Sequence, residues 1–241
     1  PRLTEFKSGI SDTTEVRPVA IEDLLGRPQK PLNRISMAGL IRGKRVLITG
    51  AGGSIGSELV RQICNLEPAE LTLLESSEFN LYSIDMEISE SHPNLIRRAI
   101  IADVRNQSAI DRLFQDTSPE LVFHAAALKH ITFVEEDPME ALKTNFLATY
   151  KLCKICKSHN IPKFIFISTD KAVRPTNFMG ATKRVAEMIV QNFSSQKTKL
   201  SAVRFGNVLG SSGSVIPLLE KLIIIFFQKL KQHLFHQNQN Y

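Results

Sequence analysis

The stretch Thr49–Glu58, TGAGGSIGSE, decides the fold of this 241-residue chain. Just before it, residues 45–50 (RVLITG) form a short, nearly all-apolar run of the kind found in a strand buried on both faces. Residues 54–66 (SIGSELVRQICNL) follow with the apolar spacing of a helix. The stretch therefore predicts a strand, a glycine-rich turn and a helix in direct succession.

Glycines in such a turn let the backbone bend sharply and approach a pyrophosphate closely. The N-terminus of the following helix offers N–H groups and a favourable dipole to the same phosphates. A tight turn without a ligand is the alternative, but the strand, the helix and a downstream acid are all present. The residues that we expect to bind a dinucleotide here are Gly50, Gly53, Ser54, Ile55 and Gly56.

The downstream acid is Glu75, which ends a second apolar run at residues 71–75 and lies 19 residues after Gly56. A carboxylate at this place accepts hydrogen bonds from the ribose hydroxyls of NAD and repels the 2′-phosphate of NADP. No Arg or Lys follows in residues 75–80 (ESSEFN). We therefore expect NAD as the cofactor, in preference to NADP.

Two further strand ends carry candidate cofactor contacts. Asp103, followed by Val104, is placed to accept a hydrogen bond from the adenine amino group, and a helix cap or loop acid is the alternative. Ala125 and Ala126 are small residues at a strand end that must lie under a flat cofactor, and tight core packing is the alternative.

Apolar runs and helical patterns alternate along the chain from Lys44 onward. The predicted strands are residues 45–50, 71–75, 96–103, 121–127, 163–168 and 200–205, and the predicted helices are residues 54–66, 77–89, 108–114, 138–159 and 180–193. This alternation predicts an α/β fold with a doubly wound parallel sheet of the Rossmann type.

Three segments of different character follow from this pattern. Residues 1–42 hold several prolines and little periodicity, and we expect a lead-in arm with one short helix at 19–27 (VAIEDLLGR). Residues 43–217 are the expected NAD-binding domain with its catalytic segment. Residues 218–241 end in a Gln-, His- and Asn-rich tail without turn signals. Because the chain starts with Pro1, we expect a fragment or a processed product.

Charge and cysteine content narrow the partners. The net charge is +6, but the charges are scattered, so solvated faces are favoured over a nucleic-acid surface. Three cysteines make no disulfide framework, and the lone pair in LCKICK (152–157) lies in a helical pattern, so we expect no metal site and a reducing, cytoplasmic compartment. No signal peptide and no apolar run of about 20 residues is present.

Four stretches resemble a known family: residues 50–59 (GAGGSIGSEL), 124–130 (HAAALKH), 168–187 (STDKAVRPTNFMGATKRVAE) and 204–217 (RFGNVLGSSGSVIP). They resemble the extended short-chain dehydrogenase/reductases, and more narrowly the nucleotide-sugar 4,6-dehydratases of polysaccharide biosynthesis. The long, membrane-anchored form acting on UDP-N-acetylglucosamine is the most similar. The resemblance covers roughly residues 18–217. It implies that the C-terminal substrate subdomain is largely missing, through truncation or a change of reading frame.

The resemblance implies a redox cycle that closes on itself. NAD takes hydride from C4 of the sugar, water leaves across C5 and C6, and the hydride returns to C6, giving a UDP-4-keto-6-deoxy sugar. The adjacent Asp170 and Lys171 are then the expected acid at C6 and base at C5, and an ion pair that only closes a loop is the alternative. Ser168 or Thr169 is expected to bond the 4-oxygen.

Met179 stands where the wider superfamily has a catalytic Tyr, four residues before Lys183. A thioether moves no proton, but the resemblance implies that Met is the ordinary state of this subgroup. The C4 proton then passes to Lys171, Asp170 or a water, and Lys183 holds the nicotinamide ribose. The alternative is that Met179 fills space after loss of function.

Substrate contacts are expected from Lys129, His130 and Asn207. The resemblance also implies a homo-oligomer and a longer parent protein anchored at the cytoplasmic face of the inner membrane. A non-catalytic dinucleotide-binding remnant stays open as an alternative function, as does a C5-inverting dehydratase or 4-epimerase.

Overall fold

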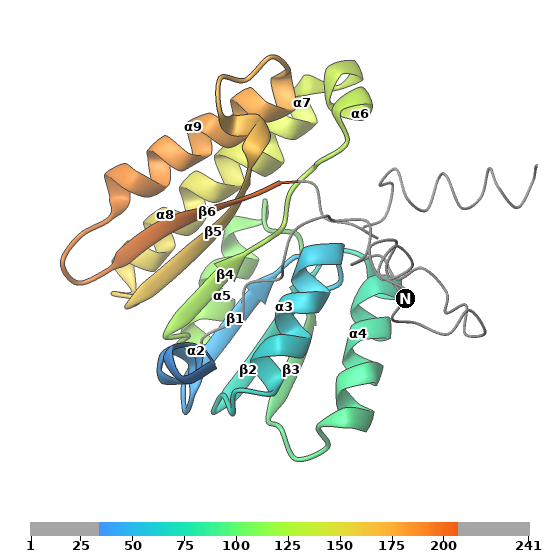
Figure 1. Ribbon diagram of the computed structural model, residues 1–241, viewed down its shortest axis with the longest axis vertical. Coiled ribbons are helices and arrows are strands. Elements are labelled where there is room, and N and C mark those ends of the chain that lie inside the picture. Colours follow the sequence, from blue (N-terminus) through green and yellow to red (C-terminus); the bar gives the residue numbers. More distant parts are fainter. Residues whose placement is uncertain (1–33, 207–241) are drawn as a thin grey trace, which may run out of the picture. The chain divides into compact units, whose positions relative to one another are not determined.

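The computed structural model of the chain describes residues 34–206 and contains one six-stranded sheet with helices on both faces (Figure 1). The strands are β1 (Arg45–Thr49), β2 (Glu70–Glu75), β3 (Arg97–Ile101), β4 (Leu121–His124), β5 (Lys163–Thr169) and β6 (Lys199–Phe205). They are all parallel, in the order β3-β2-β1-β4-β5-β6. The doubly wound parallel sheet predicted from the sequence is confirmed.

Eight α-helices connect or flank the strands within the described residues. They are α2 (Arg34–Ile41), α3 (Ser54–Cys64), α4 (Glu78–Ser91), α5 (Gln107–Thr117), α6 (Ile131–Glu136), α7 (Pro138–Ala141), α8 (Ala148–Ser158) and α9 (Phe178–Phe193). The helix expected at 19–27, Asn207 and the tail 218–241 lie outside the described residues.

The core is divided by the sheet into two layers, because side chains alternate along each strand. On one face, Val46 and Ile48 of β1 pack with α2, α3 and α4. On the other face, Leu47 of β1 and Phe164 and Phe166 of β5 pack with α5, α8 and α9. Because helices cover both faces of β1, its side chains are buried on both sides, and its sequence is therefore nearly all apolar.

Helix starts follow the sequence signals. The side chain of Ser77 accepts a hydrogen bond from the backbone N–H of Asn80 and so caps the start of α4. Pro138 occupies the first turn of α7, where its missing N–H costs nothing. Asn177, which the sequence did not single out, caps α9 by accepting from the N–H of Gly180.

Two helical features differ from the sequence expectation. The arm expected over residues 1–42 contains α2, whose Ile41 is 3% exposed within the core, so the folded unit begins before residue 43. The single helix expected at 138–159 is instead α7, a π-helical segment (Leu142–Leu147) and α8. The π-helical segment contains Asn145, a buried polar residue whose side chain accepts a hydrogen bond from Leu128, outside its own helix.

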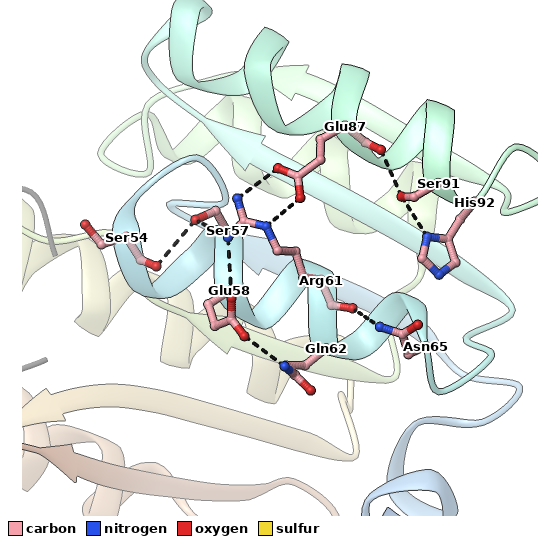
Figure 2. Close-up of polar contacts among 9 residues, drawn as sticks. All are labelled: Ser54, Ser57, Glu58, Arg61, Gln62, Asn65, Glu87, Ser91 and His92. Carbon is pink, nitrogen blue, oxygen red and sulfur yellow. Dashed lines mark hydrogen bonds and ion pairs between the residues drawn. The ribbon is translucent and has the colours of Figure 1, made fainter. Parts of the chain in front are cut away.

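Helices α3 and α4 are joined at the surface by polar side chains (Figure 2). Arg61 of α3 donates two hydrogen bonds to the carboxylate of Glu87 on α4 and also contacts Glu58. The Arg61 and Glu87 side chains are 41% and 43% exposed, so the pair adds little to stability. Packing of the apolar layer beneath holds the two helices.

Cys153 and Cys156 are free, buried residues of α8, as the helical pattern predicted. Among residues 34–206, no helix has the length and apolar character needed to span a bilayer.

Candidate active site

The carboxyl ends of all six strands lie at one edge of the sheet, because every pairing is parallel. The register sets Thr49 beside Leu74 and His124, and sets Thr169 beside Phe205. The glycine turn, Glu75 and the segment after β5 therefore come to the same edge. From β1 the strand order runs one way to β2 and β3 and the other way to β4, β5 and β6, so it switches between β1 and β4, and ligands bind at such a switch point in open α/β sheets.

The glycine turn has room for backbone only. Gly50 has a φ of +69°, and a Cβ there would lie 2.6 Å from the backbone nitrogen of Ala126. A Cβ on Gly56 would lie 1.8 Å from the carbonyl oxygen of Gly50. Gly53 precedes α3 and supplies no side-chain cap, and Ser54 and Ile55 form the first, half-buried turn. This backbone cradle at a helix N-terminus fits a pyrophosphate.

Glu75 is 8% exposed and contacts the turn directly. Its Oε2 accepts from the N–H of Gly52 at 3.1 Å, and its Oε1 accepts from the N–H groups of Ser76 and Ser77 at 2.9 and 3.1 Å. The sequence predicted a ribose acceptor at this place. The structure adds that the same carboxylate ties the end of β2 to the glycine turn.

Asp103 lies after β3, beside the buried Val104. Its carboxylate accepts from the backbone N–H and the Nε of Arg105, at 2.8 and 2.7 Å, and these hydrogen bonds hold the pKa of Asp103 below its usual value. Arg105 also contacts Glu140 at the start of the helical run. Asp103 is therefore a paired loop acid that keeps part of its surface exposed.

The segment after β4 passes close to the glycine turn. Ala125 donates its N–H to the carbonyl of Thr49 at 3.0 Å, and Ala126 meets Gly50. Further along, the fully buried Asn145 accepts from the N–H of Leu128 at 2.9 Å and donates to its carbonyl at 3.0 Å. Asn145 was not predicted, although a lone Asn on the inner face of an apolar helix was the available signal.

His124 closes β4 beneath this segment and is fully buried. Its Nδ1 lies 2.7 Å from the hydroxyl of Thr49, and its Nε2 lies 3.0 Å from the hydroxyl of Thr149. Burial, together with the smaller effect of the nearby positive charge of Lys183, lowers the pKa of His124 to about 3. The imidazole is therefore a neutral bridge between β1, β4 and α8.

Asp170 and Lys171 form a short 3-10 helix after β5, Asp170–Ala172. Nζ of Lys171 lies 3.3 Å from Oδ1 of Asp170, and the two side chains are 35% and 54% exposed respectively. Burial raises the pKa of Asp170, but hydrogen bonds from Thr169 and Lys171 together outweigh this effect and lower it. Thr169 also accepts from the N–H of Lys171, so its hydroxyl shapes the turn.

Ser168 is directed into the protein. Its hydroxyl donates to Oε1 of Glu187 at 2.6 Å, and the Glu187 side chain is 1% exposed. Arg204 of β6 donates twice to the same carboxylate at 2.8 and 2.7 Å, and Arg184 donates once at 3.0 Å. Burial raises the pKa of Glu187, but the bonds from Arg204, Ser168 and Arg184 lower it to about 2. Of the two candidates for the 4-oxygen, Thr169 is therefore the more accessible.

Lys183 is buried on α9, with its Nζ 3.0 Å from the carbonyl oxygen of Ile167 and 4.5 Å from the ring centre of Phe166. Burial lowers the pKa of Lys183 to about 7, although the attraction of Glu187 raises it. The Nζ of Lys183 is thus bound to the residue that precedes Ser168 in β5. It lies at the same end of β5 as the Asp170–Lys171 pair.

Met179 is 3% exposed and belongs to a small apolar cluster with Val134 and Ala141. Its side chain packs between α6, α7 and α9, so it has a packing role. Lys129 and His130 are exposed residues between β4 and α6, and the His130 ring lies 6.0 Å from that of Phe133.

A family model described as "Polysaccharide biosynthesis protein" matches residues 46–225, which is most of the chain. The chain belongs to this family. The match runs past Pro217, where the sequence resemblance was expected to stop.

Individual family relatives are longer than this chain. The capsular polysaccharide biosynthesis protein CapD of Staphylococcus aureus is 44% identical over 226 residues, which cover 92% of this chain and 38% of CapD. A UDP-N-acetylglucosamine 4,6-dehydratase (inverting) of Campylobacter jejuni is 34% identical over 189 residues, covering 76% of this chain and 55% of that protein. The X-ray structure of Pen from Bacillus thuringiensis superposes with a TM-score of 0.71 and 35% identity, over 76% of this chain and 58% of that one. The chain therefore spans 38% to 58% of the length of these relatives.

Proposed function

We propose that this polypeptide is the cofactor-binding and catalytic part of a nucleotide-sugar 4,6-dehydratase that acts on UDP-N-acetylglucosamine. The proposal rests on the Asp170–Lys171 ion pair. This pair lies at the same edge of the sheet as the glycine turn, where the carboxyl ends of the strands meet. Elimination of water needs an acid and a base at adjacent carbons, and this pair supplies both groups. The similarity to the Campylobacter dehydratase supports the assignment.

The residues around the glycine turn fit a nicotinamide dinucleotide. Gly50 and Gly56 let the backbone of the turn pack closely, so its N–H groups would face the pyrophosphate, Glu75 would accept from the ribose, and Lys183 would hold the nicotinamide ribose. When bound, the dinucleotide supplies the transient oxidation at C4 and the return of hydride to C6. MoeE5, a solved protein of this fold, is described in complex with UDP-glucose and NAD, which supports the proposal.

NAD is favoured over NADP by the contacts of Glu75. Its carboxylate already accepts from the N–H groups of Ser76 and Ser77, which are donors that a 2′-phosphate needs. A phosphate here would both lose those donors and face the negative charge. We therefore expect binding of NAD and discrimination against NADP.

The acid and base roles require a proton to move within the ion pair. In the folded protein the lowered pKa of Asp170 favours carboxylate, whereas leaving-group protonation at C6 needs the acid form. Transfer of one proton from Lys171 to Asp170 across the 3.3 Å contact yields a neutral acid and a neutral amine. Bound substrate would displace water from Asp170 and Lys171. Charged groups that lose water are less stable than neutral ones, so substrate binding would promote the proton transfer from Lys171 to Asp170.

The first experiment is to incubate the chain with NAD and UDP-N-acetylglucosamine and to follow the sugar nucleotide by mass spectrometry. Loss of one water from the substrate is the expected result. Asp170→Asn and Lys171→Met are each expected to slow the reaction by about 10²–10⁴-fold while NAD binding persists. Lys44→Met, at the opposite edge of the sheet, removes an exposed ion pair and serves as the control.

Two outcomes would redirect the assignment. NAD binding without water loss would identify a dinucleotide-binding remnant whose activity belongs to the longer parent protein. A product of unchanged mass would indicate a 4-epimerase, an activity named for other relatives such as the UDP-glucose 4-epimerase of Rickettsia akari. The configuration of C5 in a dehydrated product decides between inverting and retaining chemistry.

A further inference from the structure

Gly180, in the first turn of α9, lies against the backbone of the turn that carries Asp170 and Lys171. A Cβ on Gly180 would lie 2.3 Å from the carbonyl oxygen of Lys171 and 3.1 Å from its carbonyl carbon. Non-bonded carbon and oxygen atoms do not approach to 2.3 Å, so no side chain fits unless the turn or the helix moves. A glycine inside a helix costs about 1 kcal/mol relative to alanine, so its presence here calls for a packing reason.

The other contacts of α9 leave it little freedom to retreat from the turn. Its first N–H, from Phe178, donates to Glu135 at 2.6 Å, and the buried side chain of Met179 packs in the apolar cluster with α6 and α7. One turn further on, Nζ of Lys183 is bound to the carbonyl of Ile167. A side chain at position 180 would therefore move the more exposed partner, the 170–175 turn.

The turn has one exposed side toward which it can shift. Ala172 is fully buried, whereas Val173, Arg174 and Pro175 are exposed. On the side of β6, a Cβ on Gly206 would lie 3.9 Å from Oδ2 of Asp170, which is an ordinary contact distance. Gly180 therefore restrains the turn more tightly than Gly206 does.

We infer that Gly180 is a positioning residue: its lack of a side chain sets the distance between α9 and the Lys171 backbone, and so places the Asp170–Lys171 pair relative to Lys183. The inference rests on the proposed function for the chemical role of the pair, but not for the geometry. A misplacement of reacting groups by about 1 Å costs on the order of a hundredfold in rate. Gly180→Ala is therefore expected to act on catalysis more than on binding.

The test compares Gly180→Ala with wild type by two independent readouts. In the first, the amine of Lys171 is acylated and its rate of modification is followed by mass spectrometry, with Lys163 and Lys199 at the other end of the sheet as internal references. Gly180→Ala is expected to speed modification of Lys171 alone. In the second, kcat for dehydration is expected to fall about a hundredfold, with KM and the affinity for NAD nearly unchanged.

Gly39→Ala is the matched control, because a Cβ on Gly39 meets no atom within 4 Å. It is expected to leave both readouts at their wild-type values. Unaltered Lys171 modification and unaltered kcat in Gly180→Ala would overturn the inference. A Gly180→Ala chain that fails to fold would also overturn it, because Gly180 would then be a folding residue. If wild type forms no product, the proposed function fails, while the labelling of Lys171 still decides the geometry.

Discussion

Met179 occupies a position at which a hydroxyl is expected in related reductases, and the structure shows what the thioether does instead. The side chain is 3% exposed and contacts the apolar residues Val134 and Ala141. The thioether moves no proton and is instead buried in an apolar cluster that joins α6 and α7 to α9. Met179 therefore has a packing role, and the proton transfers proposed for Asp170 and Lys171 need no hydroxyl at this position.

Met179→Tyr is expected to lower stability and to leave turnover no higher than wild type. The larger ring overpacks the cluster, and its hydroxyl gains no partner there, at a cost of about 1–3 kcal/mol. Met179→Leu, which conserves volume, is the control and is expected to cost under about 1.5 kcal/mol. Urea unfolding and the water-loss assay measure the two effects. A rise in turnover of about a hundredfold in Met179→Tyr would show that the site is impaired by its Met.

At the scale of elements, the glycine turn joins β1 to α3, and its glycines differ in how close a Cβ would lie to the backbone of the turn. A Cβ on Gly56 would lie 1.8 Å from the carbonyl oxygen of Gly50, whereas a Cβ on Gly53 would lie 3.3 Å from the same atom. Gly56→Ala is therefore expected to abolish NAD binding and Gly53→Ala to weaken it, as measured by calorimetric titration. Equal affinities in the two variants would contradict a role for this close approach.

Two arginines with similar geometry join neighbouring elements but differ in the burial of their partner. Arg61 and Arg204 are both 41% exposed, and each donates two hydrogen bonds to one Glu. Glu87 is 43% exposed, whereas Glu187 is 1% exposed. Figure 2 shows the two hydrogen bonds from Arg61 of α3 to Glu87 of α4. Because a buried carboxylate depends on its remaining donors, the two pairs are expected to contribute unequally.

Arg204→Met and Arg61→Met form a matched test of this difference. Exposed pairs contribute about 0.2–1 kcal/mol, so Arg61→Met is expected to shift the urea midpoint little. Arg204→Met leaves the buried Glu187 short of two donors, and groups stranded in this way typically cost about 1–3 kcal/mol or more. The pKa of Glu187 is also expected to rise in Arg204→Met. Equal midpoints in the two variants would contradict the argument.

For the whole molecule, two buried groups predict loss of stability in acid. The pKa of His124 is about 3 in the folded protein, against an ordinary value of 6.5, so between these values the unfolded chain binds a proton that the folded chain does not. The free energy of unfolding therefore falls as pH decreases from 6.5, by about 1.4 kcal/mol per pH unit within that window. Glu187, with a pKa of about 2 against 4.5, adds the same sign below pH 4.5.

Urea unfolding between pH 6 and pH 5 isolates the contribution of His124, because Glu187 titrates lower and Lys183, with a pKa of about 7, is already mostly protonated in the folded chain. His124→Gln is expected to unfold more easily at pH 7, since it loses the ring contacts with Phe164 and Phe166, and to show a flatter dependence on pH. A variant with the wild-type slope would show that another group causes the acid sensitivity.

The sequence by itself determined the sheet and the glycine turn, because both depend on patterns among residues close in the chain. Apolar runs such as residues 45–50 are typical of strands buried on both faces, and three glycines at fixed spacing between such a run and a helix leave few backbone alternatives. The adjacency of Asp170 and Lys171 was equally visible. Parallel pairing then brought these segments to one edge without further information.

Only the tertiary structure decided which polar groups are paired and which are accessible. Ser168 was an expected substrate contact, but it donates to Glu187, a residue 19 positions away on α9. Asn145 binds the loop after β4, and Gly180 meets the carbonyl of Lys171. These contacts join segments distant in the chain, and their partners are set by how helices pack on the sheet, which no local pattern of residues specifies.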